Sequence, residues 1–122
     1  MKLFLIFGII NGFLAVSLGA FGAHGLEGKV SEQSLLIWEK AVHYQMFHTA
    51  ALLVTGLLVS KVTEAPIWWA GWLFFIGIIL FSGSLYVYST THIKFLAMIT
   101  PIGGVTFLLG WILLGYGVLK YL

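Results

Sequence analysis

Long apolar runs separated by short polar connections form the main pattern of this sequence. Four runs reach the roughly 20 residues that a helix needs to cross a bilayer; they cover residues 3–23, 41–60, 66–90 and 95–119. None of the four shows the strict apolar–polar alternation of a membrane strand. Because backbone groups in hydrocarbon must be paired within a helix or a closed barrel, the pattern predicts an all-α fold. We expect an integral membrane four-helix transmembrane bundle that forms a single domain over residues 1–122.

The one long connection, residues 24–40, predicts that the second helix begins well before its apolar run. Gly25 and Gly28 interrupt the helical pattern. Ser31 followed by Glu32 suits a helix N-cap and a negatively charged first turn. A helix from about residue 31 to the end of the second run would be roughly 45 Å long, whereas the hydrocarbon core is about 30 Å thick. We therefore expect its first turns to leave the membrane or to lie along its surface.

Composition agrees with a membrane protein and argues against several other classes. Hydrophobic residues make up 61% of the chain and charged residues 8%, against about 25% charged residues in soluble domains. The net charge of +2 is spread thinly, so we expect no nucleic-acid partner. There is no cysteine, which excludes disulfides, thiolate metal sites and a cysteine nucleophile. Neither a GxSxG nor an HExxH pattern occurs, and we expect no metal, no cofactor and, on balance, no enzymatic activity.

The first run has some features of a secretory signal, since Lys2 precedes it and small residues end it. It is longer than the 7–15 apolar residues usual in signals, so we expect it to be kept as the first span.

With four spans both termini lie on one side of the membrane. Basic residues are then equally divided between the two sides, and the acidic residues of the first loop favour termini inside.

Small residues recur along helix faces at spacings that suit close helix packing. In the first run the steps are three or four residues, and in the third and fourth runs they are seven, which favours left-handed packing near +20°. Asn11, near the middle of the first run, is expected to hydrogen-bond to another helix. The glycines that we expect at helix contacts are Gly8, Gly12, Gly19, Gly77, Gly103, Gly110 and Gly117.

Thr100 and Pro101 leave two alternatives for the fourth helix. It begins at Phe95 and is kinked by the proline, or it begins at Pro101 with Thr100 as its N-cap. In the second alternative residues 94–99 would partly re-enter the membrane. The kinked helix is slightly favoured.

Polar side chains gather toward the end of the predicted bundle that holds the first loop. At 1.5 Å per residue, His48, Ser84 and Thr100 lie roughly 10 Å inside that end. His43 and His48 are roughly 140° apart around their helix, so they do not form one ligand pair. The residues of this expected polar pocket are His24, Glu39, His43, Tyr44, Gln45, His48, Ser82, Ser84, Tyr86 and Thr100.

Several interpretations of this polar half remain open. One interpretation is a hydrogen-bonded cluster that fixes the helix register. Another is a pocket for a lipid headgroup or small amphipathic ligand, since polar groups within membranes are costly and often functional. A haem would need two facing axial histidines, and no clear pair is present. We predict a non-enzymatic binding module, or an accessory subunit in a homo-oligomer or larger membrane complex. The alternative is a small transporter or a proton- or solute-conducting protein.

A series of short motifs also resembles a known family. In order they are GAFGAHGL (residues 19–26), WEKA (38–41), YQMFH (44–48), FSGSLY (81–86), TPIGG (100–104) and the closing pair GW (110–111). Together they resemble the bacterial membrane family called domain of unknown function 423, whose animal relatives are named transmembrane protein 256. The similarity covers essentially the whole chain. It implies a four-helix protein of the bacterial cell membrane and implies no activity.

Overall fold

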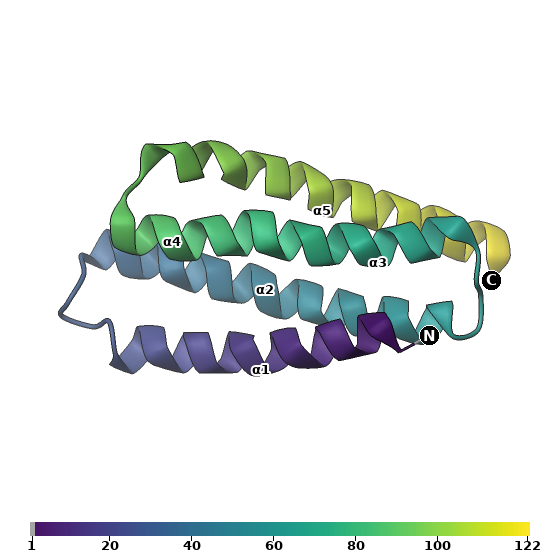
Figure 1. Cartoon of the computed structure of the whole chain (residues 1–122), viewed down its shortest axis with the longest axis horizontal. Coiled ribbons are helices and arrows are strands. Elements are labelled where there is room, and N and C mark those ends of the chain that lie inside the picture. The colour runs from purple at the N-terminus through teal and green to yellow at the C-terminus, as the bar shows by residue number, and fades with distance from the viewer. Residues whose placement is uncertain (1) are drawn as a thin grey trace.

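The computed structural model describes residues 2–122 and contains four membrane-spanning stretches of helix, each long and apolar enough to cross a bilayer (Figure 1). This confirms the expected all-α class with four spans. The third span is divided, since a π-helical segment, η1, interrupts it. The elements are α1 (Leu3–His24), α2 (Glu32–Val59), α3 (Ala65–Gly77), η1 (Ile78–Gly83), α4 (Ser84–Thr91) and α5 (Lys94–Tyr121).

The four spans lie beside one another in an open row, with both termini at the same end (Figure 1). α1 packs mainly on α2, α2 packs on the third span, and α5 packs on α3, η1 and α4. α1 and α5 therefore form the two outer edges of the row. An open row leaves more helix surface facing lipid than a closed bundle does, and it leaves grooves between helices that are not direct neighbours.

Ser31 caps α2, as the sequence predicts. Its side chain accepts a hydrogen bond from the backbone N–H of Ser34, 3.1 Å away, and Glu32 begins the helix. The early turns of α2 then contact both neighbouring spans. Trp38 donates its indole N–H to the Leu18 carbonyl of α1 at 2.8 Å, and its ring meets the edge of Tyr86 on α4. One aromatic side chain thereby joins three spans.

The glycines of the expected stripes face neighbouring helices. A Cβ on Gly8 would lie 2.6 Å from Leu53 of α2, and one on Gly117 would lie 2.5 Å from Ile67 of α3. Large side chains fill the space that the glycines leave, and Phe4, Phe74 and Ile67 are fully buried. Gly77, Gly103 and Gly110 meet another helix just as closely, whereas a Cβ on Gly12 would lie 3.5 Å from Thr49 and one on Gly19 would lie 3.3 Å from Val42.

α5 runs without interruption from Lys94 through Pro101. The alternative in which the fourth helix begins at Pro101, with a re-entrant segment before it, is therefore wrong. Proline lacks an N–H and leaves a carbonyl of the preceding turn without its usual donor, a defect that Ser and Thr side chains can compensate in membranes. The carbonyl concerned is that of Ala97, four residues before Pro101, and the Thr100 hydroxyl does not take the place of the missing N–H, since it donates to the Leu96 carbonyl at 3.3 Å.

Candidate functional site

The polar residues expected in one pocket belong to several separate groups in the structure. Those of α2 point to different neighbours, because Gln45 faces α1 and α4 whereas His48 faces α5. Ser82 donates to the Ala41 carbonyl of α2 at 2.8 Å, and Ser84 is hydrogen-bonded to Thr100 of α5 at 2.6 Å. The remaining candidates, His24, Glu39, His43 and Tyr44, are exposed on the outer surface.

The first group is a hydrogen-bonded chain across three spans. Gln45 donates from Nε2 to Oδ1 of Asn11 at 3.0 Å, and Tyr86 donates its hydroxyl to Oε1 of Gln45 at 2.6 Å. Asn11 in turn donates to the Phe7 carbonyl at 2.8 Å. Asn11 and Gln45 are buried, so the expectation that Asn11 bonds to another helix is confirmed. These bonds fix the register of α1, α2 and α4.

The second group is centred on His48. Its Nδ1 lies 2.8 Å from the Tyr44 carbonyl, and its Nε2 lies 3.0 Å from the indole nitrogen of Trp111. A carbonyl only accepts hydrogen bonds and an indole N–H only donates them. The ring must therefore be neutral, with its proton on Nδ1 and the lone pair of Nε2 directed at Trp111. The ring also stacks on Phe107 with centroids 3.5 Å apart.

This arrangement limits what His48 can do chemically. Both ring nitrogens are engaged, so an iron or zinc ion would reach Nε2 only by displacing Trp111. Protonation of the ring would place two N–H groups, of His48 and Trp111, against each other. The geometry suits a histidine that holds an aromatic surface in position.

Sequence reasoning used Trp111 only as part of a family motif, so it missed the bond of this residue to His48 and the bridging role of Trp38. A signal for both was present. Indole N–H groups need a partner when buried, and Trp111 lies in the middle of its span rather than at a membrane surface, where tryptophan is usual. A link between Ser34 and His92, whose Oγ and Nε2 are 3.1 Å apart, was also missed.

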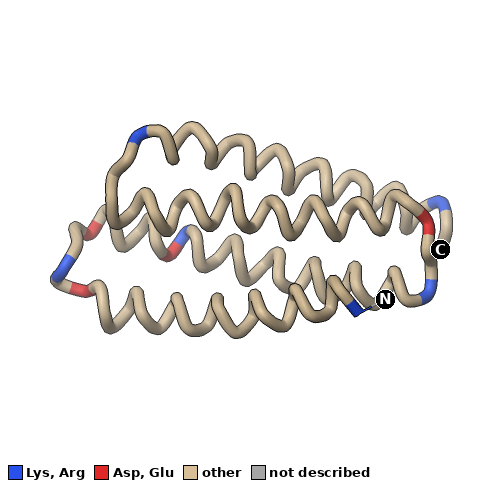
Figure 2. The backbone as a smooth tube through the Cα atoms, viewed as in Figure 1, with Lys and Arg blue, Asp and Glu red and all other residues tan. Residues whose placement is uncertain are grey.

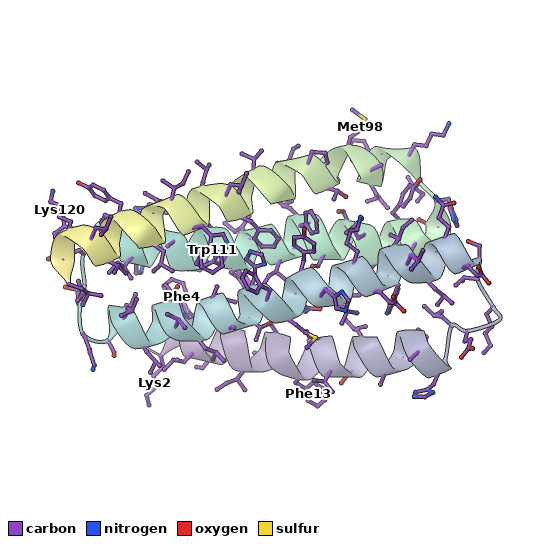
Figure 3. The ribbon with its side chains drawn as sticks, turned by 180° about the vertical axis from the view of Figure 1, so that it is seen from behind. Lys2, Phe4, Phe13, Met98, Trp111 and Lys120 are labelled. Atoms are coloured by element: carbon purple, nitrogen blue, oxygen red, sulfur yellow. The ribbon has the colours of Figure 1, made fainter. Side chains whose placement is uncertain are left out.

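A groove opens between α2 and α5, which meet chiefly where the His48 ring contacts Phe107 and Trp111. We call it the α2–α5 groove; its volume is about 470 Å³. His48 and Trp111 meet across it, and Figure 3 shows Trp111 directed from α5 toward α2. Its walls are aromatic and aliphatic, and they include Tyr44, Phe47, Phe81, Phe107 and Leu108, with Pro101 and Gly104 on the α5 side.

A second cavity lies in the crevice between the first-loop ends of α1 and α2. We call it the interfacial niche; its volume is about 300 Å³. Gly19, Gly22 and Ala23 of α1 leave room for it, and α2 contributes Trp38, Glu39 and His43 among its lining residues. It therefore combines an aromatic wall with a carboxylate.

Comparison with known proteins identifies relatives along the full length. A model of the family described as "Protein of unknown function (DUF423)" matches residues 18–104. A UPF0382 membrane protein of Staphylococcus aureus is 55% identical over 121 residues, which are 99% of this chain and 98% of that protein. The UPF0382 membrane protein YwdK of Bacillus subtilis is 50% identical over 123 residues, with 100% of both chains covered. No solved structure matches this chain.

Proposed function

This chain belongs to the DUF423 family of bacterial membrane proteins, and on that premise we propose that it is a non-enzymatic binding protein. Its ligand is a lipid or another amphipathic molecule whose hydrocarbon part occupies the α2–α5 groove. The groove carries this proposal, because its volume of about 470 Å³ falls within the 300–1,000 Å³ typical of ligand sites. Its lining contains no Lys or Glu among the residues that the structure describes, which suits a hydrocarbon chain.

The polar group at the groove supports binding more than transport. A proton-conducting protein would need His48 to take up and release a proton in each cycle. Protonation would break the bond from Trp111 to Nε2, which is one of the contacts between α2 and α5. In liposomes we therefore expect equal proton leak for the wild type and for His48→Ala, and a leak that depends on His48 would favour the conducting alternative.

Filling the groove tests the proposal. A side chain at Gly104 would enter it with little strain, because a Cβ there meets only Phe81, at 3.8 Å. Gly115 on the same helix has no atom within 4 Å of such a Cβ and is not part of the groove lining. Gly104→Leu and Gly115→Leu are thus the same change inside and outside the groove.

The measurement is native mass spectrometry of each variant extracted in patches of native membrane. We expect the wild type and Gly115→Leu to carry a bound molecule that Gly104→Leu lacks. Identical spectra for all three would contradict the proposal. Loss of a bound protein partner from Gly104→Leu alone would also contradict ligand binding. The groove would then be a contact site for another protein, and the chain would be an accessory subunit of a complex.

A further inference from the structure

We propose that the outer face of α2 binds the headgroup of a zwitterionic aminophospholipid, with the ammonium group at Glu39 and the phosphate at Lys40. This inference deepens the proposed function, because the acyl chain of the same lipid would extend into the α2–α5 groove. Four observations support it: the position of the two charges, the lining of the interfacial niche, the succession of cavities along α2, and the order of the charges.

The position of Glu39 and Lys40 is unusual for this protein. Figure 2 shows the charged residues at the two ends of the bundle, except for one acidic and one basic residue that lie within α2. These are Glu39 and Lys40, since the other charged residue of α2, Glu32, is its first residue. The bond from Trp38 to the Leu18 carbonyl places the pair about one to two turns inside the end of α1.

The lining of the interfacial niche suits the binding of an ammonium group. Glu39 lines it together with Trp38, and cations bind well where a carboxylate lies beside an aromatic wall. The indole N–H of Trp38 is already engaged by Leu18, so the ring is held in place. Gly22 has no side chain, which lets the Trp38 ring lie directly against α1; a Cβ there would overlap that ring.

A succession of cavities that share lining residues follows α2 from this niche to the α2–α5 groove. The niche shares Glu39 and His43 with a cavity of about 450 Å³ that Lys40 also lines. His43 and Tyr44 lead to a further cavity that includes Phe47, and Tyr44 and Phe47 line the α2–α5 groove. Glu39, His43 and Phe47 are spaced by four, so they form one ridge along the helix. A molecule with a polar head and a long apolar tail matches this succession of cavities.

Adjacent opposite charges point to a zwitterionic headgroup. An anionic lipid would gain from Lys40 and be repelled by Glu39, whereas a phosphate followed by an ammonium can satisfy both. His43 and Tyr44 also line the cavity that Glu39 and Lys40 line, and the neutral His43 ring can donate or accept a hydrogen bond as the headgroup requires.

The test compares two probes with the same acyl chains, dioleoyl phosphatidylethanolamine and dioleoyl phosphatidylglycerol. Their dissociation constants are measured by native mass spectrometry for the wild type, Glu39→Gln, Lys40→Gln and Glu64→Gln. Glu64 is the matched control, because it loses the same charge at the residue before α3, where its side chain makes no capping bond. All the substitutions lie on exposed positions, so the variants should fold.

We expect the wild type and Glu64→Gln to bind phosphatidylethanolamine more tightly than phosphatidylglycerol. In Glu39→Gln the ratio of the two dissociation constants should fall roughly tenfold, the size of one charge-assisted contact. Lys40→Gln should weaken the binding of both lipids. A wild type that prefers phosphatidylglycerol or has no preference, or a Glu39→Gln variant that keeps the preference, overturns this inference. Failure of the proposed function is a different result, namely equal lipid binding by Gly104→Leu and Gly115→Leu.

Discussion

Trp111 of α5 donates its indole N–H to Nε2 of His48 on α2, 3.0 Å away. The two helices pack mainly on the third span, and besides this bond they meet where the His48 ring stacks on Phe107. The bond and this ring stack together set the distance between α5 and α2, and with it the width of the α2–α5 groove. Because Nδ1 of His48 is held by the carbonyl of its own helix, the imidazole is oriented before Trp111 reaches it.

Removing this bond should destabilise the protein measurably. In Trp111→Phe, Nε2 of His48 loses its donor, and we expect the free energy of unfolding to fall by about 1 kcal/mol, the scale of interhelical hydrogen bonds in membranes. His48→Phe keeps an aromatic ring against Phe107. The measurement is a double-mutant cycle in mixed micelles, where the two effects should sum to more than the effect of the double variant. Strict additivity would show that the contact carries no energy.

The chain from Asn11 through Gln45 to Tyr86 should stabilise the fold more than a hydrogen bond within one helix. Gln45→Leu leaves the Asn11 carbonyl oxygen and the Tyr86 hydroxyl without partners, and we expect a loss of about 1–3 kcal/mol. Thr49→Val is the control, because Thr49 donates only to the Gln45 carbonyl of its own helix, at 2.7 Å. Unfolding by a denaturing detergent measures both. An equal effect of the two changes would argue against the interhelical role.

Gly103 and Gly104 are neighbours in sequence but should differ sharply in tolerance. A Cβ at Gly103 would lie 2.8 Å from backbone atoms of Leu80 and Phe81 in η1, and backbone cannot rotate away. A Cβ at Gly104 meets only the Phe81 ring, at 3.8 Å. We expect Gly103→Ala to lower the thermal midpoint or the yield of folded protein and Gly104→Ala to leave both unchanged. Thermal unfolding in detergent would show the contrast, and equal stability would be evidence against the close contact of α5 with η1.

The cap at Ser31 should be visible as local stability at the first loop. Ser31→Ala removes the acceptor for the Ser34 N–H, and we expect a loss of about 0.5–2 kcal/mol. Ser31→Asp keeps an acceptor and should restore most of it. Amide hydrogen exchange in the first turn of α2 reports the effect directly. Unchanged exchange in Ser31→Ala would mean that the neighbouring spans alone hold this turn.

Much of the fold can be predicted from the sequence, because membrane spans depend on local properties of the sequence. Run length and apolar composition are enough to predict four spans, since no other backbone structure satisfies its own polar groups as simply in hydrocarbon. Ser31 caps a helix because a hydroxyl lies next to free N–H groups in sequence. The glycine spacing identifies which face of a helix is close to another helix, and Gly8 and Gly117 illustrate it.

Only the tertiary structure decides which helix each face meets. Gln45 and His48 lie three positions apart and were expected in one pocket, yet they bond to opposite neighbours, Asn11 and Trp111. Depth along the membrane can be counted from sequence at a fixed rise per residue, whereas the order of helices around the bundle depends on the sum of many side-chain contacts between distant segments. The open row, the π-helical η1 and the α2–α5 groove follow from that packing, and no local pattern encodes them.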